Sequence, residues 1–161
     1  DKKKCVLIKG ITTGKIVDYG VKDSMNMGAC MAPAAAELIE ANFKDLDVDK
    51  DYYDAIFTGD LGQIGNRILS ELLKEKGIDV ADKLYDCGML IYEGETKCSG
   101  GSGCGCSAVV LGSCIMDRLT RGEYKRVLFV PTGALLSTVS YNEGKSVPGI
   151  AHGVILEGKE S

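Results

Sequence analysis

Short apolar runs, each bounded by polar or glycine-containing segments, occur at five places along the chain. Runs of this length are typical of buried or half-buried strands. We therefore predict strands at residues 4–9, 15–19, 54–58, 126–130 and 149–157. The run at 126–130, Arg-Val-Leu-Phe-Val, carries the clearest signal of the five.

Apolar residues recur at helical spacing in three other segments, 28–42, 64–76 and 106–119. Gly77 suits the position just after the second of these helices. Pro33 is expected in the first turn of the first helix, where its missing N–H group costs little. The connecting segments are expected to be a strand or short helix at 86–92, a loop at 96–105 and a long polar connection at 131–148.

Strands that alternate with helices predict a layered α/β domain. Sheets of this kind bind ligands in the loops beyond the carboxyl ends of their strands. The loops to search for chemistry are therefore residues 59–62, 100–107 and 132–137.

Composition narrows the function classes. The 161 residues are 45% hydrophobic and 26% charged, as in an ordinary globular protein, and the formal net charge is −4. Nucleic acid is not an expected partner, because neutralising phosphates requires a basic surface. No run of about 18 apolar residues is present, and no signal-peptide pattern follows the N-terminal lysines.

The chain has seven cysteines, an odd number, and most lie in apolar segments. This usage favours free thiols in a reducing, cytosolic compartment over a disulfide scaffold. Cys98, Cys104 and Cys106 could suggest zinc, but their spacing lacks paired ligands and the chain has a single histidine. Zinc sites need four ligands, so no metal site is predicted.

Asp60 follows a predicted strand directly and precedes a predicted helix. A carboxylate there could contact a polar ligand or a metal, or act as a general base, because it faces the positive helix end. Aspartate is also a preferred helix-capping residue, and position alone favours the cap.

The segment from Gly100 to Ser107 holds four glycines in its first six residues and opens a predicted helix. Its N–H groups could cradle an anion, although it matches neither the P-loop nor the dinucleotide fingerprint. Gly103 and Gly105 would bring the backbone close to a ligand. Cys104 and Cys106 could be acidified at the helix start, or could be small buried thiols under a tight turn.

His152 is the only histidine, so any histidine-dependent chemistry in this chain must use it. Its place on the last predicted strand allows it to face a ligand cleft. A lone strand histidine is also commonly a hydrogen-bonded core or surface residue. Catalysis by a serine–histidine–aspartate triad has no support, because no Gly-x-Ser-x-Gly elbow is present.

Several unusual strings of this sequence resemble the stage V sporulation protein AD family of spore-forming bacteria. They are the segment from Gly100 to Ser107, residues 126–137 (RVLFVPTGALLS) and residues 148–157 (PGIAHGVILE). Residues 28–36, 58–62 and 86–88 agree with it, so the resemblance covers nearly the whole chain.

That family looks like the thiolase and ketoacyl-synthase superfamily, whose members have two similar halves. The resemblance is to the C-terminal half only. It implies a single thiolase-like domain over residues 1–161, with a five-stranded mixed sheet, helices on its faces and the N-terminal half absent.

The sequence departs from the condensing enzymes of this superfamily where their catalytic residues lie. In place of the first histidine stands the Gly-Asp-Leu-Gly of 59–62, and residues 102–106 replace the second histidine or asparagine. A carboxylate supplies no protonated oxyanion donor unless its pKa is strongly raised. No catalytic residue and no cofactor is therefore predicted.

The resemblance instead implies a protein that binds dipicolinic acid or its calcium chelate for uptake into the developing spore. The candidate ligand-binding residues are Asp60, Gly103, Cys104, Gly105, Cys106 and His152. The alternative is a degenerate acyltransferase of the thiolase or ketoacyl-synthase type that acts on a thioester through Cys104 or Cys106.

The resemblance also implies membrane proteins of the spore channel as partners. Through them the protein, itself cytoplasmic, would lie at the forespore inner membrane. A domain that lacks its other half would expose the surface that normally packs against it, so a homo-oligomer is expected.

Overall fold

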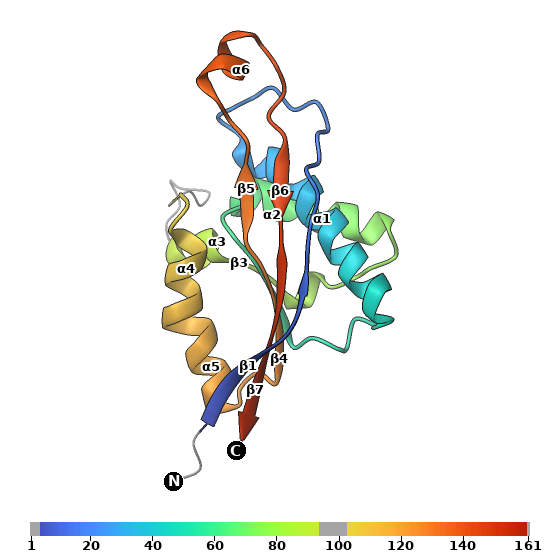
Figure 1. Ribbon diagram of the computed structural model, residues 1–161, viewed down its shortest axis with the longest axis vertical. Coiled ribbons are helices and arrows are strands. Elements are labelled where there is room, and N and C mark those ends of the chain that lie inside the picture. The colour runs from blue at the N-terminus through green and yellow to red at the C-terminus, as the bar shows by residue number, and fades with distance from the viewer. Residues whose placement is uncertain (1–3, 94–102, 161) are drawn as a thin grey trace.

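The computed structural model describes residues 4–93 and 103–160 and is built around a five-stranded mixed sheet (Figure 1). Its strands, in spatial order, are β1 (Lys4–Thr12), β7 (Gly153–Glu160), β4 (Arg126–Val130), β2 (Ala55–Thr58) and β3 (Leu84–Asp86). β4, β2 and β3 are parallel, whereas β7 is antiparallel to both of its neighbours. The parallel strands end at the same edge of the sheet, which is where a site is expected.

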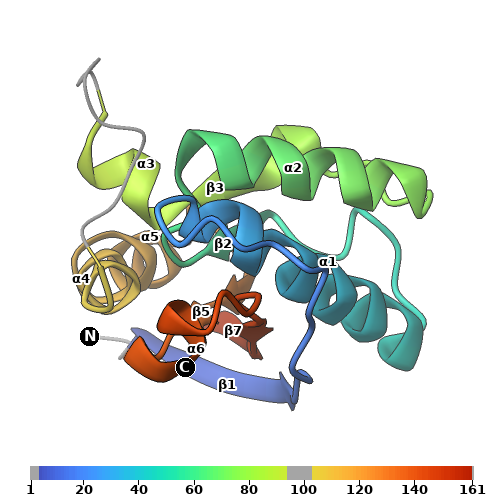
Figure 2. The ribbon, with the colours of Figure 1, turned by 90° about the horizontal axis from the view of Figure 1, so that it is seen from above.

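Two long helices, α1 (Met27–Leu46) and α2 (Gly62–Glu75), cover one face of the sheet (Figure 2). The alternation of side chains along the strands points Ile56, Leu128 and Ile155 into this layer. The core between helices and sheet is apolar, and Ile56 and Leu128 are fully buried in it.

The opposite face is covered by a helical segment made of α4 (Cys106–Val110), a π-helical turn (Leu111–Ile115) and α5 (Met116–Arg121). Phe57, Val127 and Leu156 point into this second core. The predicted helix at 106–119 is therefore present, with one irregular turn in its middle.

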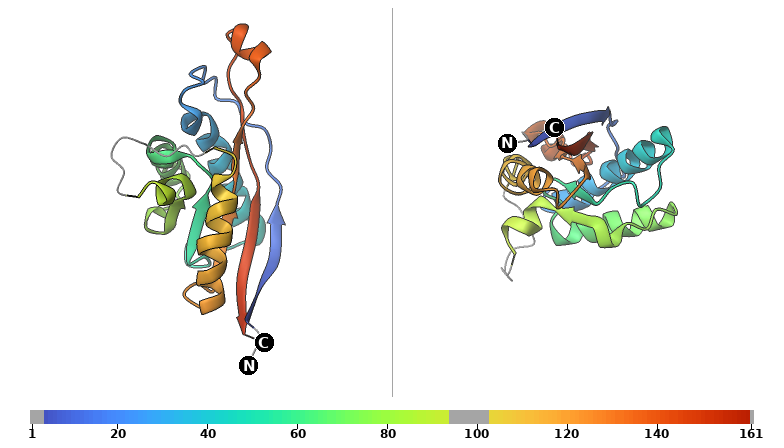
Figure 3. Two further views of the ribbon diagram at one scale, coloured as in Figure 1. Left: turned by 90° about the vertical axis from the view of Figure 1, so that its left-hand side faces the viewer. Right: turned by 90° about the horizontal axis from the view of Figure 1, so that it is seen from below.

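The remaining elements are short. They are the 3₁₀ turn at Ala81–Lys83, α3 (Cys87–Ile91), β5 (Thr132–Ala134), α6 (Thr138–Asn142) and β6 (Gly149–Ala151). β5 and β6 form a two-stranded ribbon that continues beyond the main sheet and has α6 at its tip (Figures 1 and 3). The segment 86–92, expected as a strand or a short helix, holds the end of β3 and then α3.

The predicted strand at 15–19 is wrong. Only Val17 pairs, in an isolated antiparallel bridge with Gly149 that has N···O distances of 2.8 and 2.9 Å. Val17 is also the only buried residue of the segment, whereas Ile16 and Tyr19 are about 60% exposed. The segment therefore crosses the ribbon at one point and does not extend a sheet.

Three other expectations need correction. The connection at 131–148 contains β5 and α6, and the strand at 149–157 is interrupted at His152, where the chain leaves the ribbon and enters the main sheet. The first helix begins at Met27, capped by the Asn26 side chain, which accepts a hydrogen bond from the Ala29 N–H. Pro33 consequently lies beyond the first turn, where it removes an internal helix bond.

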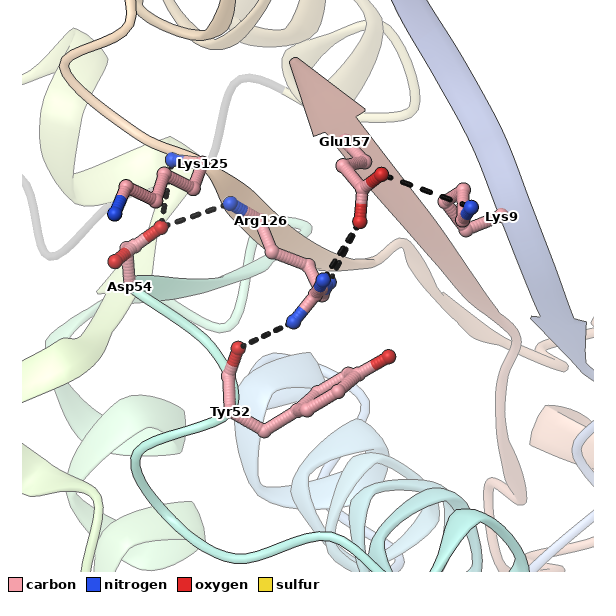
Figure 4. A network of polar contacts seen from close by, with 6 residues as sticks. All are labelled: Lys9, Tyr52, Asp54, Lys125, Arg126 and Glu157. Atoms are coloured by element: carbon pink, nitrogen blue, oxygen red, sulfur yellow. Dashed lines mark hydrogen bonds and ion pairs between the residues drawn. The ribbon is translucent and has the colours of Figure 1, made fainter. Parts of the chain in front are cut away.

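At the other end of the sheet, Arg126 ties three segments together (Figure 4). Its guanidinium pairs with Glu157 at 2.7 Å and lies 4.1 Å from the centre of the Tyr52 ring. Lys9 on β1 approaches the same carboxylate at 3.6 Å, and Asp54 accepts a hydrogen bond from the Arg126 N–H at 2.8 Å. This network lies where β4 begins, so it stabilises the sheet away from the strand ends that carry the site.

None of the helices within residues 4–93 and 103–160 combines the length and the apolar character that crossing a bilayer requires.

Candidate functional site

A pocket of about 790 Å³ lies beyond the carboxyl ends of β2 and β4. Its walls are residues 23–28 and Met31 at the start of α1, the turn after β2, the turn before α4, and β5. The position agrees with the expectation for an α/β sheet, and the pocket brings together parts of all three loops singled out in the sequence.

Asp60 lines this pocket and is partly exposed. Its Oδ2 accepts a hydrogen bond from the Gly103 N–H at 3.1 Å. A Cβ atom placed on Gly88 would lie 1.9 Å from Asp60 Oδ1, so the absence of a side chain at 88 leaves room for this carboxylate. The carboxylate is therefore held between the turn before α4 and the start of α3.

The interpretation of Asp60 as a helix cap is wrong. The N-cap of α2 is Leu61, whose side chain forms no capping bond. Asp86 performs the capping from the neighbouring strand, because its carboxylate accepts hydrogen bonds from the N–H groups of Leu61 and Gly62 at 2.8 and 3.0 Å. Asp60 therefore does not cap α2, and its carboxylate lines the pocket.

Asp86 is the supporting residue that the sequence analysis missed. Besides the two α2 bonds it accepts from the Thr58 hydroxyl at 2.8 Å and from the Met89 N–H at 3.2 Å. Burial raises the pKa of this carboxyl, while its hydrogen bonds to Leu61, Thr58, Met89 and Gly62 act in the opposite direction. The available signal was its place at the end of a strand, directly before the short helix.

The glycine-rich segment divides at the pocket. Gly103, with a φ of +82°, and Cys104 line the wall and are exposed. Gly105 is the N-cap residue of α4 and lies outside the lining. Cys106 is buried in the second core, with its sulfur 3.9 Å from the Gly59 carbonyl oxygen. Residues 100–102 and Cys98 lie outside the described part of the chain.

His152 is placed away from this pocket. It is exposed, and its Nδ1 accepts a hydrogen bond from the Gly14 N–H at 3.1 Å. It is not among the described residues that line the pocket. Of the six candidate residues, the structure thus brings Asp60, Gly103 and Cys104 together.

Among the lining residues that were not candidates, three carry polar side chains whose positions bear on the site. Asp23 accepts from the Met25 N–H at 3.0 Å, Asn26 caps α1, and Thr132 follows β4 within a loop that the sequence had singled out. The charged residues in the described lining are Asp23 and Asp60, both acidic.

The Cys87 thiol, next to Asp86 in the sequence, offers little chemistry. Burial raises the pKa of the Cys87 thiol well above its usual range, and the neighbouring Asp86 adds to the effect. That thiol stays protonated and unreactive. Within the described residues, no three His, Cys, Asp or Glu side chains cluster in a way that could hold a metal ion by themselves.

Comparison with known proteins links the chain to a family. The sequence model described as Stage V sporulation protein AD (SpoVAD) matches residues 1–157. Stage V sporulation protein AD of Bacillus subtilis (strain 168) is 47% identical over 153 residues, covering 94% of this chain and 45% of that protein. This chain thus spans less than half the length of that relative.

Solved structures share the fold at low identity. The tetronic acid condensing enzyme AbyA1 matches with a TM-score of 0.55 at 14% identity, covering 94% of this chain and 48% of that one. The 3-oxoacyl-(acyl carrier protein) synthase III (FabH) of Pseudomonas aeruginosa PAO1 matches with 0.52 at 11% identity, covering 96% and 51%. The predicted thiolase-like α/β fold with a five-stranded mixed sheet is thereby confirmed.

Proposed function

Because the chain belongs to the stage V sporulation protein AD family and has a thiolase-like fold, we propose that it is a non-catalytic sporulation protein. Its proposed ligand is dipicolinic acid or the calcium chelate of that acid, taken up into the developing spore. The observation that carries the proposal is the pocket beyond β2 and β4, with the Asp60 carboxylate fixed in its wall.

The chemistry of the wall suits a small planar ligand that carries a metal ion. The pocket volume of about 790 Å³ lies within the usual range for small-molecule sites. Calcium takes oxygen ligands, and aspartate carboxylates are common among them. In the chelate, the ring nitrogen and both carboxylates of dipicolinate already hold the ion, so the protein needs to add only a few oxygens.

The charge of the wall favours the chelate over the free acid. At neutral pH dipicolinate is a dianion, and Asp23 and Asp60 would repel it. Binding of Ca²⁺ cancels the charge of the dianion and turns the same two carboxylates into attractive groups. We therefore expect binding to depend on calcium.

The geometry gives less support to the alternative, a degenerate acyltransferase acting on a thioester. Cys104 is an exposed thiol on the pocket wall, which is the observation in its favour. A nucleophilic thiol needs a neighbouring base, and the sole histidine bonds to Gly14 outside the pocket. Acyl-CoA turnover, or acylation of Cys104 detected by mass spectrometry, would support the enzyme.

Replacing Asp60 with alanine is expected to weaken binding of calcium dipicolinate about tenfold or more, because a charged oxygen ligand is lost. Calorimetry on the full-length protein, with calcium and with a calcium chelator, measures the affinity for dipicolinate. His152→Ala is the matched control and should bind as the parent does, because His152 lies outside the pocket lining. Unchanged binding by Asp60→Ala would remove this carboxylate from the site.

A second variant tests whether the position of the Asp60 carboxylate matters in addition to its charge. In Gly88→Ala the new methyl group would displace the Asp60 carboxylate while leaving its charge in place. Weakened binding in this variant as well would support a role for the position of Asp60. The partners at the forespore membrane and the homo-oligomer stay predictions. Light scattering would measure the oligomeric state.

A further inference from the structure

The hydroxyl oxygen of Thr132 is buried and forms no hydrogen bond with the residues that the structure describes. Buried hydroxyl groups in folded proteins are nearly always paired, because burial without a partner destabilises the folded state. The packing of the fold does not explain why this hydroxyl group is left unpaired at the wall of a pocket.

The backbone of Thr132 is held firmly in place. It is the first residue of β5 and pairs with Ala151 of β6. On its other side it abuts Gly59, where an added Cβ would lie 2.9 Å from the Thr132 nitrogen and 2.7 Å from its Oγ1. The freedom left to this side chain is therefore rotation about the Cα–Cβ bond, which has three staggered positions.

Thr132 belongs to the pocket wall and lies beside the turn that carries Asp60. The two acidic side chains of the wall offer carboxylate oxygens, which accept hydrogen bonds. A carboxylate-bearing ligand needs donors as well, and a hydroxyl group can donate. The wall thus contains a donor without a partner where the proposed ligand would bring acceptors.

We propose that Thr132 is a ligand-binding residue of this pocket, and that its hydroxyl turns about the Cα–Cβ bond to donate a hydrogen bond to a carboxylate oxygen of the bound ligand. The inference rests on the proposed function, since it takes the calcium dipicolinate chelate as the ligand. It adds a residue that selects for a carboxylate at a defined place, beside the Asp60 turn.

A role of Thr132 in packing alone predicts unchanged ligand binding by a valine variant, whereas both roles predict that valine is tolerated in the absence of ligand. If the position served only packing on β5, valine would fill it with the same shape and without a buried polar atom. Thr132→Val is therefore expected to unfold at an equal or higher temperature than the parent in the absence of ligand. A loss of binding without a loss of stability in this variant would therefore point to a role of the hydroxyl in binding.

The test uses calorimetry with calcium dipicolinate and thermal unfolding, both on the longest natural form of the protein. Thr132→Val should bind roughly tenfold more weakly without loss of unfolding temperature, whereas Thr132→Ser keeps the hydroxyl and should bind like the parent. The matched control is Thr120→Val on α5, whose hydroxyl bonds to the Met116 carbonyl outside the pocket, and its binding should be unchanged.

Binding of Thr132→Val equal to that of the parent would overturn the inference and leave the proposed function standing. Equal weakening in the serine and valine variants would also overturn it, because the loss would then follow packing and not the hydroxyl. If the parent protein itself binds neither dipicolinate nor its chelate, the proposed function fails first, and this inference fails with it.

Discussion

Replacing Asp86 with alanine is expected to destabilise the protein by about 3–5 kcal/mol, because it leaves several buried donors without an acceptor. The Asp86 carboxylate is 2% exposed and accepts from Thr58, Leu61, Gly62 and Met89. Two of these donors, the N–H groups of Leu61 and Gly62, lie at the N-terminal end of α2 and have no partner within that helix. Urea unfolding followed by circular dichroism measures the loss.

Asp54→Ala provides the matched control for this prediction. Asp54 also accepts hydrogen bonds from two backbone N–H groups, those of Lys125 and Arg126, at 2.7 and 2.8 Å. Asp54 is exposed, so water can take over these bonds and the expected loss is about 1 kcal/mol or less. Equal losses in the two variants would show that burial of the Asp86 network does not matter as argued.

A second large effect is expected from Gly28→Ala, which should destabilise the protein by about 2–4 kcal/mol. A Cβ at this position would lie 2.1 Å from the Leu61 carbonyl oxygen and 3.2 Å from Gly65 Cα. The Leu61 oxygen already accepts the Gly65 N–H at 3.2 Å, so moving it disturbs the first turn of α2. The same change would shift one wall of the pocket, which Gly28 and Leu61 both line.

The direction of the stability change distinguishes a glycine in a tight contact from one in open space. In an open helix, alanine is more favourable than glycine by about 1 kcal/mol. Gly112→Ala, in the π-helical turn before α5, meets no atom within 4 Å and is expected to leave stability unchanged or raise it. Thermal unfolding of both variants compares them directly. A Gly28→Ala protein as stable as the parent would show that α1 and α2 can separate at little cost.

Much of the fold could be predicted from local patterns. The strands at β2 and β4 and the helices α1 and α2 carry periodicity that tertiary contacts reinforce. The segment 15–19 has a similar apolar sequence pattern, yet it lacks a neighbouring strand edge along most of its length and pairs only at Val17. β5 was missed for the opposite reason, because a three-residue strand carries too little periodicity to stand out.

The site could be predicted only in part, because its geometry depends on which loops meet. The rule that ligands bind beyond strand ends located Asp60, Gly103 and Cys104. The choice between a capping and a pocket role for Asp60 depended on Asp86, which is 26 residues away in sequence and adjacent in space through the pairing of β2 with β3. His152 was placed on a strand, but the chain bends there from one sheet to the other.

The sheet order also bears on how the chain folds. β1 is the first strand in the sequence, β7 is the last, and they pair along almost their full lengths, from Lys4 with Glu160 to Thr12 with Gly153. Among the described strands β1 pairs with β7 alone, and β7 also supplies the link between β1 and β4. Contacts between strands that are far apart in the sequence form slowly. During synthesis, β1 can pair with β7 only after β7 has left the ribosome. Until then the backbone of β1 is unpaired and open to aggregation, and the Ile8 and Ile11 side chains stay 67% exposed even in the folded chain.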